Sequence, residues 1–107
     1  QIIMKKVVIN NTVAAIYAGG KLLIPGTNVV DDKEFNADKD DVKSFIKGGS
    51  LSVKDSDKMT DADKKKAVEN LTSREAVKDL KEAVKGVDTK PAEEKLDQLD
   101  EQLKKGS

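Results

Sequence analysis

The sequence contains no histidine, no cysteine and no tryptophan. Most enzymes place at the reacting centre a side chain that titrates or attacks near neutral pH, and histidine and cysteine are the usual ones. Their absence excludes Ser–His and Cys–His nucleophiles, histidine acid–base chemistry and the common zinc sites. It also excludes disulfide bonds, in agreement with assembly in a reducing compartment. No carboxylate pair has a spacing diagnostic of acid–base catalysis, so the sequence does not predict an enzyme.

The chain also lacks an excess of charge of either sign, because 20 basic residues balance 20 acidic ones in 107 residues. Residues 1–55 carry 8 Lys/Arg and 7 Asp/Glu, and residues 56–107 carry 12 and 13. Dedicated nucleic-acid-binding proteins usually have a clear basic excess. A DNA adaptor would need its lysines clustered on one surface; the lysines concerned are Lys64, Lys65, Lys66, Lys78, Lys81 and Lys85. Acidic residues surround the run 64–66, and Lys78 and Lys81 are interleaved with acidic residues, so we expect no such cluster.

Long apolar runs are missing as well. No segment approaches the ~20 apolar residues that a transmembrane helix needs. Residues 4–18 begin with lysines and continue with apolar residues, which superficially fits a signal peptide. Asn10, Asn11 and Thr12 fall in the middle of that apolar region, so we expect no signal peptide.

The first half of the chain has a sequence pattern typical of short strands joined by turns. Four segments are rich in β-branched or aliphatic residues: 7–9, 13–17, 22–24 and 51–53. Gly-Gly or Pro-Gly pairs separate the last three of them. Pro25-Gly26 suits a type II turn. All three aromatic residues lie in this half, which predicts the main core there. The expected core residues are Val8, Ile16, Leu23, Val42, Phe45, Ile46, Leu51 and Val53.

One helix is expected within this half. Asp38 or Asp40 can cap its start, and Val42, Phe45 and Ile46 follow at helical spacing. Gly48-Gly49 ends it. The sequence therefore predicts an α+β protein in which residues 1–55 form a small β-rich module of order β-β-β-α-β.

Residues 56–107 are rich in Lys, Asp, Glu and Ala and contain no aromatic residue. They predict a short helical segment of three helices. Thr60 starts the first, and Thr72-Ser73-Arg74-Glu75 reads as a capping box for the second, which Gly86 ends. Residues 87–91 form an extended connector, because Pro91 keeps Lys90 out of helical geometry.

The last predicted helix carries Ala92, Leu96, Leu99 and Leu103 at spacings of 4, 3 and 4. This a/d pattern lasts less than two heptads. Such a stripe packs within its own domain or docks onto another chain, and we take Leu96, Leu99 and Leu103 as candidate protein-interaction residues.

The acidic segment 31–41 contains the only pattern that suggests a metal. Asn36, Asp38 and Asp40 match the start of an EF-hand loop, but the sixth and twelfth positions are Asp41 and Lys47 instead of Gly and Glu. Carboxylates that cap a helix explain the segment better. Gly19-Gly20-Lys21 lacks the rest of a phosphate-binding loop and reads as a turn. The sequence predicts neither a metal site nor a cofactor.

Residues 16–30, which include Ile24-Pro25-Gly26-Thr27-Asn28-Val29-Val30, lead into the predicted helix 40–46 and the segment 48–53. This run resembles the small N-terminal module of Mu-like prophage FluMu proteins and related phage head-region proteins. Residues 77–84, 87–91 and 95–99 similarly resemble the helix–extended-loop–helix unit that accompanies that module. The two similarities together cover residues 5–103.

The resemblance implies a phage or prophage origin and a non-enzymatic structural role in the virion, accessory to the capsid or the head–tail region. It implies capsid or connector proteins as partners and the host cytoplasm as the place of assembly. Helix–extended-loop–helix units bind nucleic acid or protein, and the missing basic excess argues against nucleic acid here. The alternative is a soluble binding module, either an assembly chaperone or a nucleic-acid adaptor.

Overall fold

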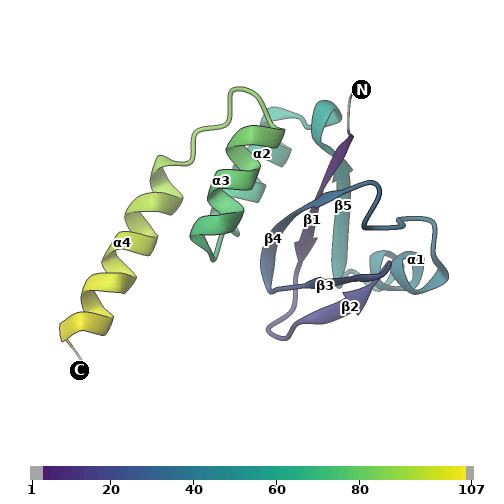
Figure 1. The fold of residues 1–107 in the computed structure, drawn as a ribbon, viewed down its shortest axis with the longest axis horizontal. Helices are drawn as coiled ribbons and strands as arrows, with labels where there is room; N and C mark the ends of the chain where they lie inside the picture. The colour runs from purple at the N-terminus through teal and green to yellow at the C-terminus, as the bar shows by residue number, and fades with distance from the viewer. Residues whose placement is uncertain (1–3, 106–107) are drawn as a thin grey trace.

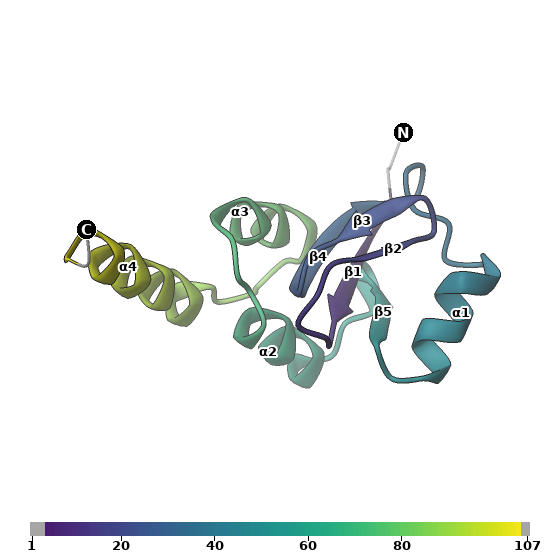
Figure 2. The same ribbon diagram turned by 90° about the horizontal axis from the view of Figure 1, so that it is seen from below.

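The computed structural model describes residues 4–105, and Figures 1 and 2 show its arrangement. The protein has an α+β fold built on a three-stranded antiparallel sheet of order β4-β1-β5. The central strand β1 spans Lys5–Asn10, and its neighbours β4 and β5 span Gly26–Asp31 and Leu51–Asp55. A separate two-stranded hairpin pairs β2 with β3 (Ile16–Ala18 and Lys21–Leu23).

Four helices complete the described chain: α1 (Asp40–Lys47), α2 (Asp61–Glu69), α3 (Arg74–Ala83) and α4 (Lys90–Lys105), with a 3-10 turn, η1, at Ser56–Lys58. The hairpin and α1 cover one face of the sheet, and α2 and α3 cover the other (Figure 1). The helix α4 continues beyond them and projects from the body, as Figure 2 shows.

The central strand explains this layered arrangement. Val7, Val8 and Ile9 are successive and all buried, which is the pattern of a strand covered on both faces. Since side chains alternate along a strand, Val7 and Ile9 face α2 and α3, whereas Val8 faces the hairpin and α1. Two apolar clusters therefore lie on opposite sides of one strand, and residues from both halves of the chain build the first of them.

The fourth strand differs from the sequence prediction. The N-terminal half has the order β-β-β-β-α-β, because Gly26–Asp31 pairs along the whole of β1. The second strand is also shorter than the predicted 13–17: it begins at Ile16, and Val13 is fully exposed. The chain bends at Pro25, and Gly26, with a positive φ of 90°, is already the first residue of β4. The N–H of Thr27 donates to the carbonyl of Asn70 and so does not close a turn onto Ile24.

The predicted core is confirmed in part. Val8, Leu23, Val42 and Leu51 are buried. Ile16, Phe45 and Val53 are half-buried and pack against the cluster on the hairpin side. The prediction was wrong for Ile46, which is 40% exposed, because α1 is covered on one side only. Phe35 was not predicted and is 2% exposed; it is the largest buried side chain.

The residues that cap the helix N-termini agree with the sequence prediction for α2 but differ for α3 and α1. Thr60 caps α2 as predicted, and its hydroxyl and the Asp63 carboxylate each accept a backbone N–H. The predicted capping box at Thr72 was wrong: Ser73 caps α3 instead, and the Thr72 hydroxyl donates to the carbonyl of Pro25. The cap position of α1 is Lys39, which makes no side-chain cap, so neither Asp38 nor Asp40 has that role.

The connector before α4 also differs. Helix α3 ends at Ala83, ahead of Gly86, and α4 already begins at Lys90. Pro91 sits in its first turn, where a missing N–H leaves no intrahelical bond unmade. The carbonyl of Thr89 accepts the N–H of Glu93, which starts the helical hydrogen-bond pattern. Lys90 is therefore helical, contrary to the prediction.

Candidate functional site

The leucine stripe of α4 changes from buried to exposed along the helix. Ala92 is 5% exposed, Leu96 is half-buried, Leu99 is 48% exposed and Leu103 is 74% exposed. Ala92 and Leu96 pack against the cluster formed by the sheet, α2 and α3. The structure thus places the three candidate leucines on one helix face and anchors only the first of them in the molecule.

Ion pairs from α3 hold α4 in place. The Arg74 guanidinium contacts carboxylate oxygens of Asp97 at 2.7 Å and Asp100 at 2.5 Å. Hydrogen bonds to Asp100 and Asp97 raise the pKa of Arg74. One helix pitch closer to the connector, the Lys81 ammonium lies 2.7 Å from Glu93, and this hydrogen bond lowers the pKa of the Glu93 carboxyl. All of these groups are partly exposed, so their attraction is screened by solvent.

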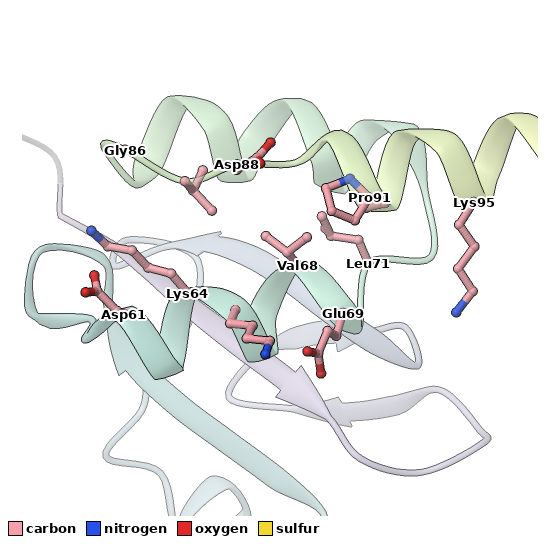
Figure 3. Close-up of a pocket in the computed structure, with 12 residues that line it drawn as sticks. Asp61, Lys64, Val68, Glu69, Leu71, Gly86, Asp88, Pro91 and Lys95 are labelled. Atoms are coloured by element: carbon pink, nitrogen blue, oxygen red, sulfur yellow. The ribbon is translucent and has the colours of Figure 1, made fainter.

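A groove of about 610 Å³ lies between α2, the α3–α4 connector and the first turns of α4 (Figure 3). Its floor is apolar, and its rim carries charges of both signs. Lysine side chains stand at both ends, since Lys64 comes from α2 and Lys95 from α4 (Figure 3). The floor consists of Val68, Leu71, Val87, Pro91 and Ala92, and the rim of Asp61, Lys64, Lys65, Glu69, Asp88 and Lys95.

A second hollow of about 380 Å³ continues on the other side of Leu71. It lies between α4 and the loops that follow β1 and β3, and Leu96 and Leu99 form one of its walls. The two hollows share Glu69, Leu71 and Lys95. An apolar path therefore runs from the connector, past Leu71, to the exposed part of the α4 stripe.

The acidic side chains of the described residues form no metal centre. Within residues 4–105 no group of three or more acidic side chains is arranged to hold a metal ion. In the acidic segment, the Asp41 carboxylate accepts the N–H of Val42 and, more weakly, that of Gly19. The Asn36 side chain accepts the N–H of Asp38. These side-chain oxygens therefore accept hydrogen bonds from main-chain N–H groups at and near the start of α1.

The lysines considered for DNA binding are distributed over separate places. Lys64 and Lys65 line the large groove, and the Lys64 ammonium donates to the carbonyl of Lys85. Lys78 and Lys81 border a hollow between α3 and α4 that also contains Asp97 and Glu93. Lys66 lies beside Asp63 near β5. Each lysine group is thus accompanied by carboxylates.

Sequence reasoning identified the α4 stripe but not the groove beside it. The lining residues Val87, Pro91 and Lys95 belong to a connector and a helix flank, and nothing in their spacing relates them to α2. Val68 on α2 and Leu71 just after it line the groove only because of where α4 lies.

No described helix combines the length and the apolar character that a membrane crossing requires. Compared with known proteins, the chain matches no family model, no curated protein and no solved structure. The resemblance of residues 16–53 to the phage module therefore stays a hypothesis that rests on the sequence motifs alone.

Proposed function

We propose that this chain is a non-enzymatic protein-interaction module that attaches to its partner through the outer half of α4. One observation carries the proposal: a single apolar stripe starts in the core at Ala92 and ends at Leu103, which is 74% exposed. An exposed leucine on the outer half of α4, where solvent surrounds the helix, contributes little to the stability of the free protein. If a partner covered Leu99 and Leu103, each Å² of apolar surface removed from water would favour binding by about 25 cal/mol.

The adjoining hollows support the same proposal. A partner helix laid along α4 would contact Leu99 and reach the apolar path past Leu71. Helix-in-groove recognition uses this combination of an apolar floor and a charged rim. In the phage setting that the sequence motifs imply, the partner is a capsid or connector protein and the chain is an accessory component of the virion.

The experiment is reconstitution with purified capsid and connector proteins of the phage or prophage whose genome carries the gene. Size-exclusion chromatography should show co-migration with one of them, and the double variant Leu99→Ala/Leu103→Ala should lose it. Ile46→Ala is the matched control, since Ile46 is also an exposed aliphatic residue (40%) but lies on α1. Equal binding by both variants would contradict the proposal.

Mass spectrometry of purified virions tests the particle assignment separately. We expect the chain at a fixed ratio to the capsid protein. A chain that binds free capsid protein but is missing from finished particles would instead act as an assembly chaperone.

A further inference from the structure

A second apolar surface lies on the hairpin, away from the α4 stripe. The inner face of the hairpin is buried through Ala18 and Leu23. Its outer face should then be polar in a protein that exposes it to water. Instead, Tyr17 and Leu22 are directly opposite each other across the two strands and are 67% and 57% exposed. Ile24 lies on the same side two residues after Leu22 and is 36% exposed.

A hollow of about 230 Å³ separates this face from α3. Leu22 and Ile24 line one side, and Glu75 and Asp79 line the other. Asn28 also borders the hollow, but both ends of its side-chain amide bond to main-chain groups of the β3–β4 turn. The hollow therefore joins apolar side chains to two carboxylates, and Lys21 also belongs to its lining.

The two acidic residues have no cation of their own. Within residues 4–105, neither Glu75 nor Asp79 forms an ion pair, and they are spaced i, i+4 on one helix face. Like charges at this spacing destabilise a helix slightly. Lys21, which lines the same hollow, pairs with Glu34 at 2.9 Å and with neither of the two carboxylates of α3.

We propose that this surface binds a basic amphipathic segment of a partner protein. Apolar side chains of that segment would cover Tyr17, Leu22 and Ile24, while its lysine or arginine side chains would pair with Glu75 and Asp79. Charge complementarity selects this occupant, because an acidic segment would meet two unpaired carboxylates. The surface uses no residue of the α4 stripe and is independent of the function proposed above.

The probe is a synthetic amphipathic helix of about 15 residues with leucine along one face and lysine along one flank. Its matched control carries glutamate in place of lysine. Titration into the full chain, followed by amide chemical shifts, should perturb the hairpin and the first turns of α3 for the lysine peptide only. The affinity should fall steeply between low and high salt.

Two double variants with the same change in net charge test the site. Glu75→Gln/Asp79→Asn should weaken binding roughly tenfold, as expected for two partly exposed ion pairs. Glu94→Gln/Glu101→Gln removes two carboxylates from the solvent side of α4 and should leave the affinity unchanged. Leu22→Ser should weaken binding without unfolding the chain, because Leu22 is already 57% exposed.

The inference would be overturned by no binding at low salt, by equal binding of the glutamate peptide, or by equal loss in the two double variants. Perturbations confined to α4 and abolished by Leu99→Ala/Leu103→Ala would also overturn it, while leaving the proposed function of α4 in place.

Discussion

The hydroxyl of Thr27 donates a hydrogen bond to the main-chain carbonyl of Ala67, with 2.6 Å between the two oxygens. The backbone N–H of Thr27 also donates to the carbonyl of Asn70 at 2.8 Å. The last carbonyls of a helix have no partner within the helix. One residue at the start of β4 thus satisfies carbonyls at the end of α2 and joins the sheet to the helices.

Replacing Thr27 with valine should lower the free energy of unfolding by about 1–3 kcal/mol. Thr27 is fully buried, so the carbonyl of Ala67 would lose its partner where water cannot replace it. Urea unfolding followed by circular dichroism measures the loss. Thr72→Val is the matched control: it also removes a hydroxyl that donates to a carbonyl, that of Pro25, but at an exposed position. Equal losses in both variants would show that burial is not the reason.

Comparing Gly26→Ala with Gly49→Ala should separate two causes of lost stability. One is the steric clash of a new Cβ with a neighbouring atom, and the other is the strain of a positive φ. A Cβ at Gly26 would lie 2.2 Å from the carbonyl oxygen of Asn70, and the residue has a φ of +90°. Gly49 has a similar φ of +84° with no atom within 4 Å. Gly49→Ala should therefore cost about 1–2 kcal/mol, and Gly26→Ala about 1–3 kcal/mol more. Chemical denaturation of both variants provides the comparison, and similar losses would mean that the sheet and α2 can move apart freely.

Truncation of the α4 stripe should affect stability in the order of burial. Leu103→Ala and Leu99→Ala should each cost less than about 1 kcal/mol, because most of the Leu103 surface and about half of the Leu99 surface are already in water. Leu80→Ala on α3 should cost about 2–5 kcal/mol, since Leu80 is fully buried. Thermal unfolding measures all three. A loss at Leu99 as large as that at Leu80 would make the stripe internal packing and would remove the basis for docking.

The link between α3 and α4 should be sensitive to salt. Arg74→Ala removes both contacts to Asp97 and Asp100, so it should lower the melting temperature at low ionic strength. The difference from the parent chain should become small in about 1 M salt, where charges are screened over about 3 Å. Lys78→Ala is the control on the same helix, because Lys78 has no ion pair among the described residues. If the difference in melting temperature did not depend on salt, the aliphatic part of the Arg74 side chain would stabilise the fold by packing instead.

The ion pair between Lys6 and Asp55 should make part of the stability depend on pH. The hydrogen bond from Lys6 lowers the pKa of the Asp55 carboxyl, and the same bond is the main cause of the raised pKa of Lys6. A carboxylate with a lowered folded pKa stabilises the fold above its unfolded value, and this contribution disappears as the pH falls through the folded value. The lysine contribution is complete below its unfolded pKa and disappears as the pH rises through its folded pKa.

Asp55→Asn should therefore be less stable than the parent chain near pH 7, by about 1 kcal/mol or less. The difference should shrink as the pH is lowered below about 4. Unfolding curves across this range measure it. Asp57→Asn removes a neighbouring exposed carboxylate that makes no ion pair within residues 4–105, and it should leave the pH dependence of the parent intact.

Local sequence signals determined much of the fold. Apolar residues at helical spacing predicted all four helices, and Thr60 marked the start of α2 correctly. The α+β class followed from the change of composition near residue 55. These features depend on residues within a few positions of one another, which is why they can be read from the sequence.

The strand β4 was missed because its signals are mixed. It begins at Gly26, directly after a proline, and Asn28 interrupts its apolar residues. Each of these residues disfavours a strand when considered alone. Pairing with β1 along its full length overrides those preferences, and Thr27 and Asn28 obtain partners that only the folded chain supplies.

The sequence by itself determined the absence of the usual catalytic residues, the helical periodicities and the leucine stripe of α4. The tertiary structure decided which parts of these patterns are exposed. Ala92 and Leu99 look alike in the heptad, yet one is buried and the other is 48% exposed, because the apolar cluster that includes α2 and α3 reaches only the first turns of α4. The grooves beside α4 and the acidic wall facing the hairpin likewise join residues that are distant in the chain. Their existence depends on packing between elements, which local spacing does not encode.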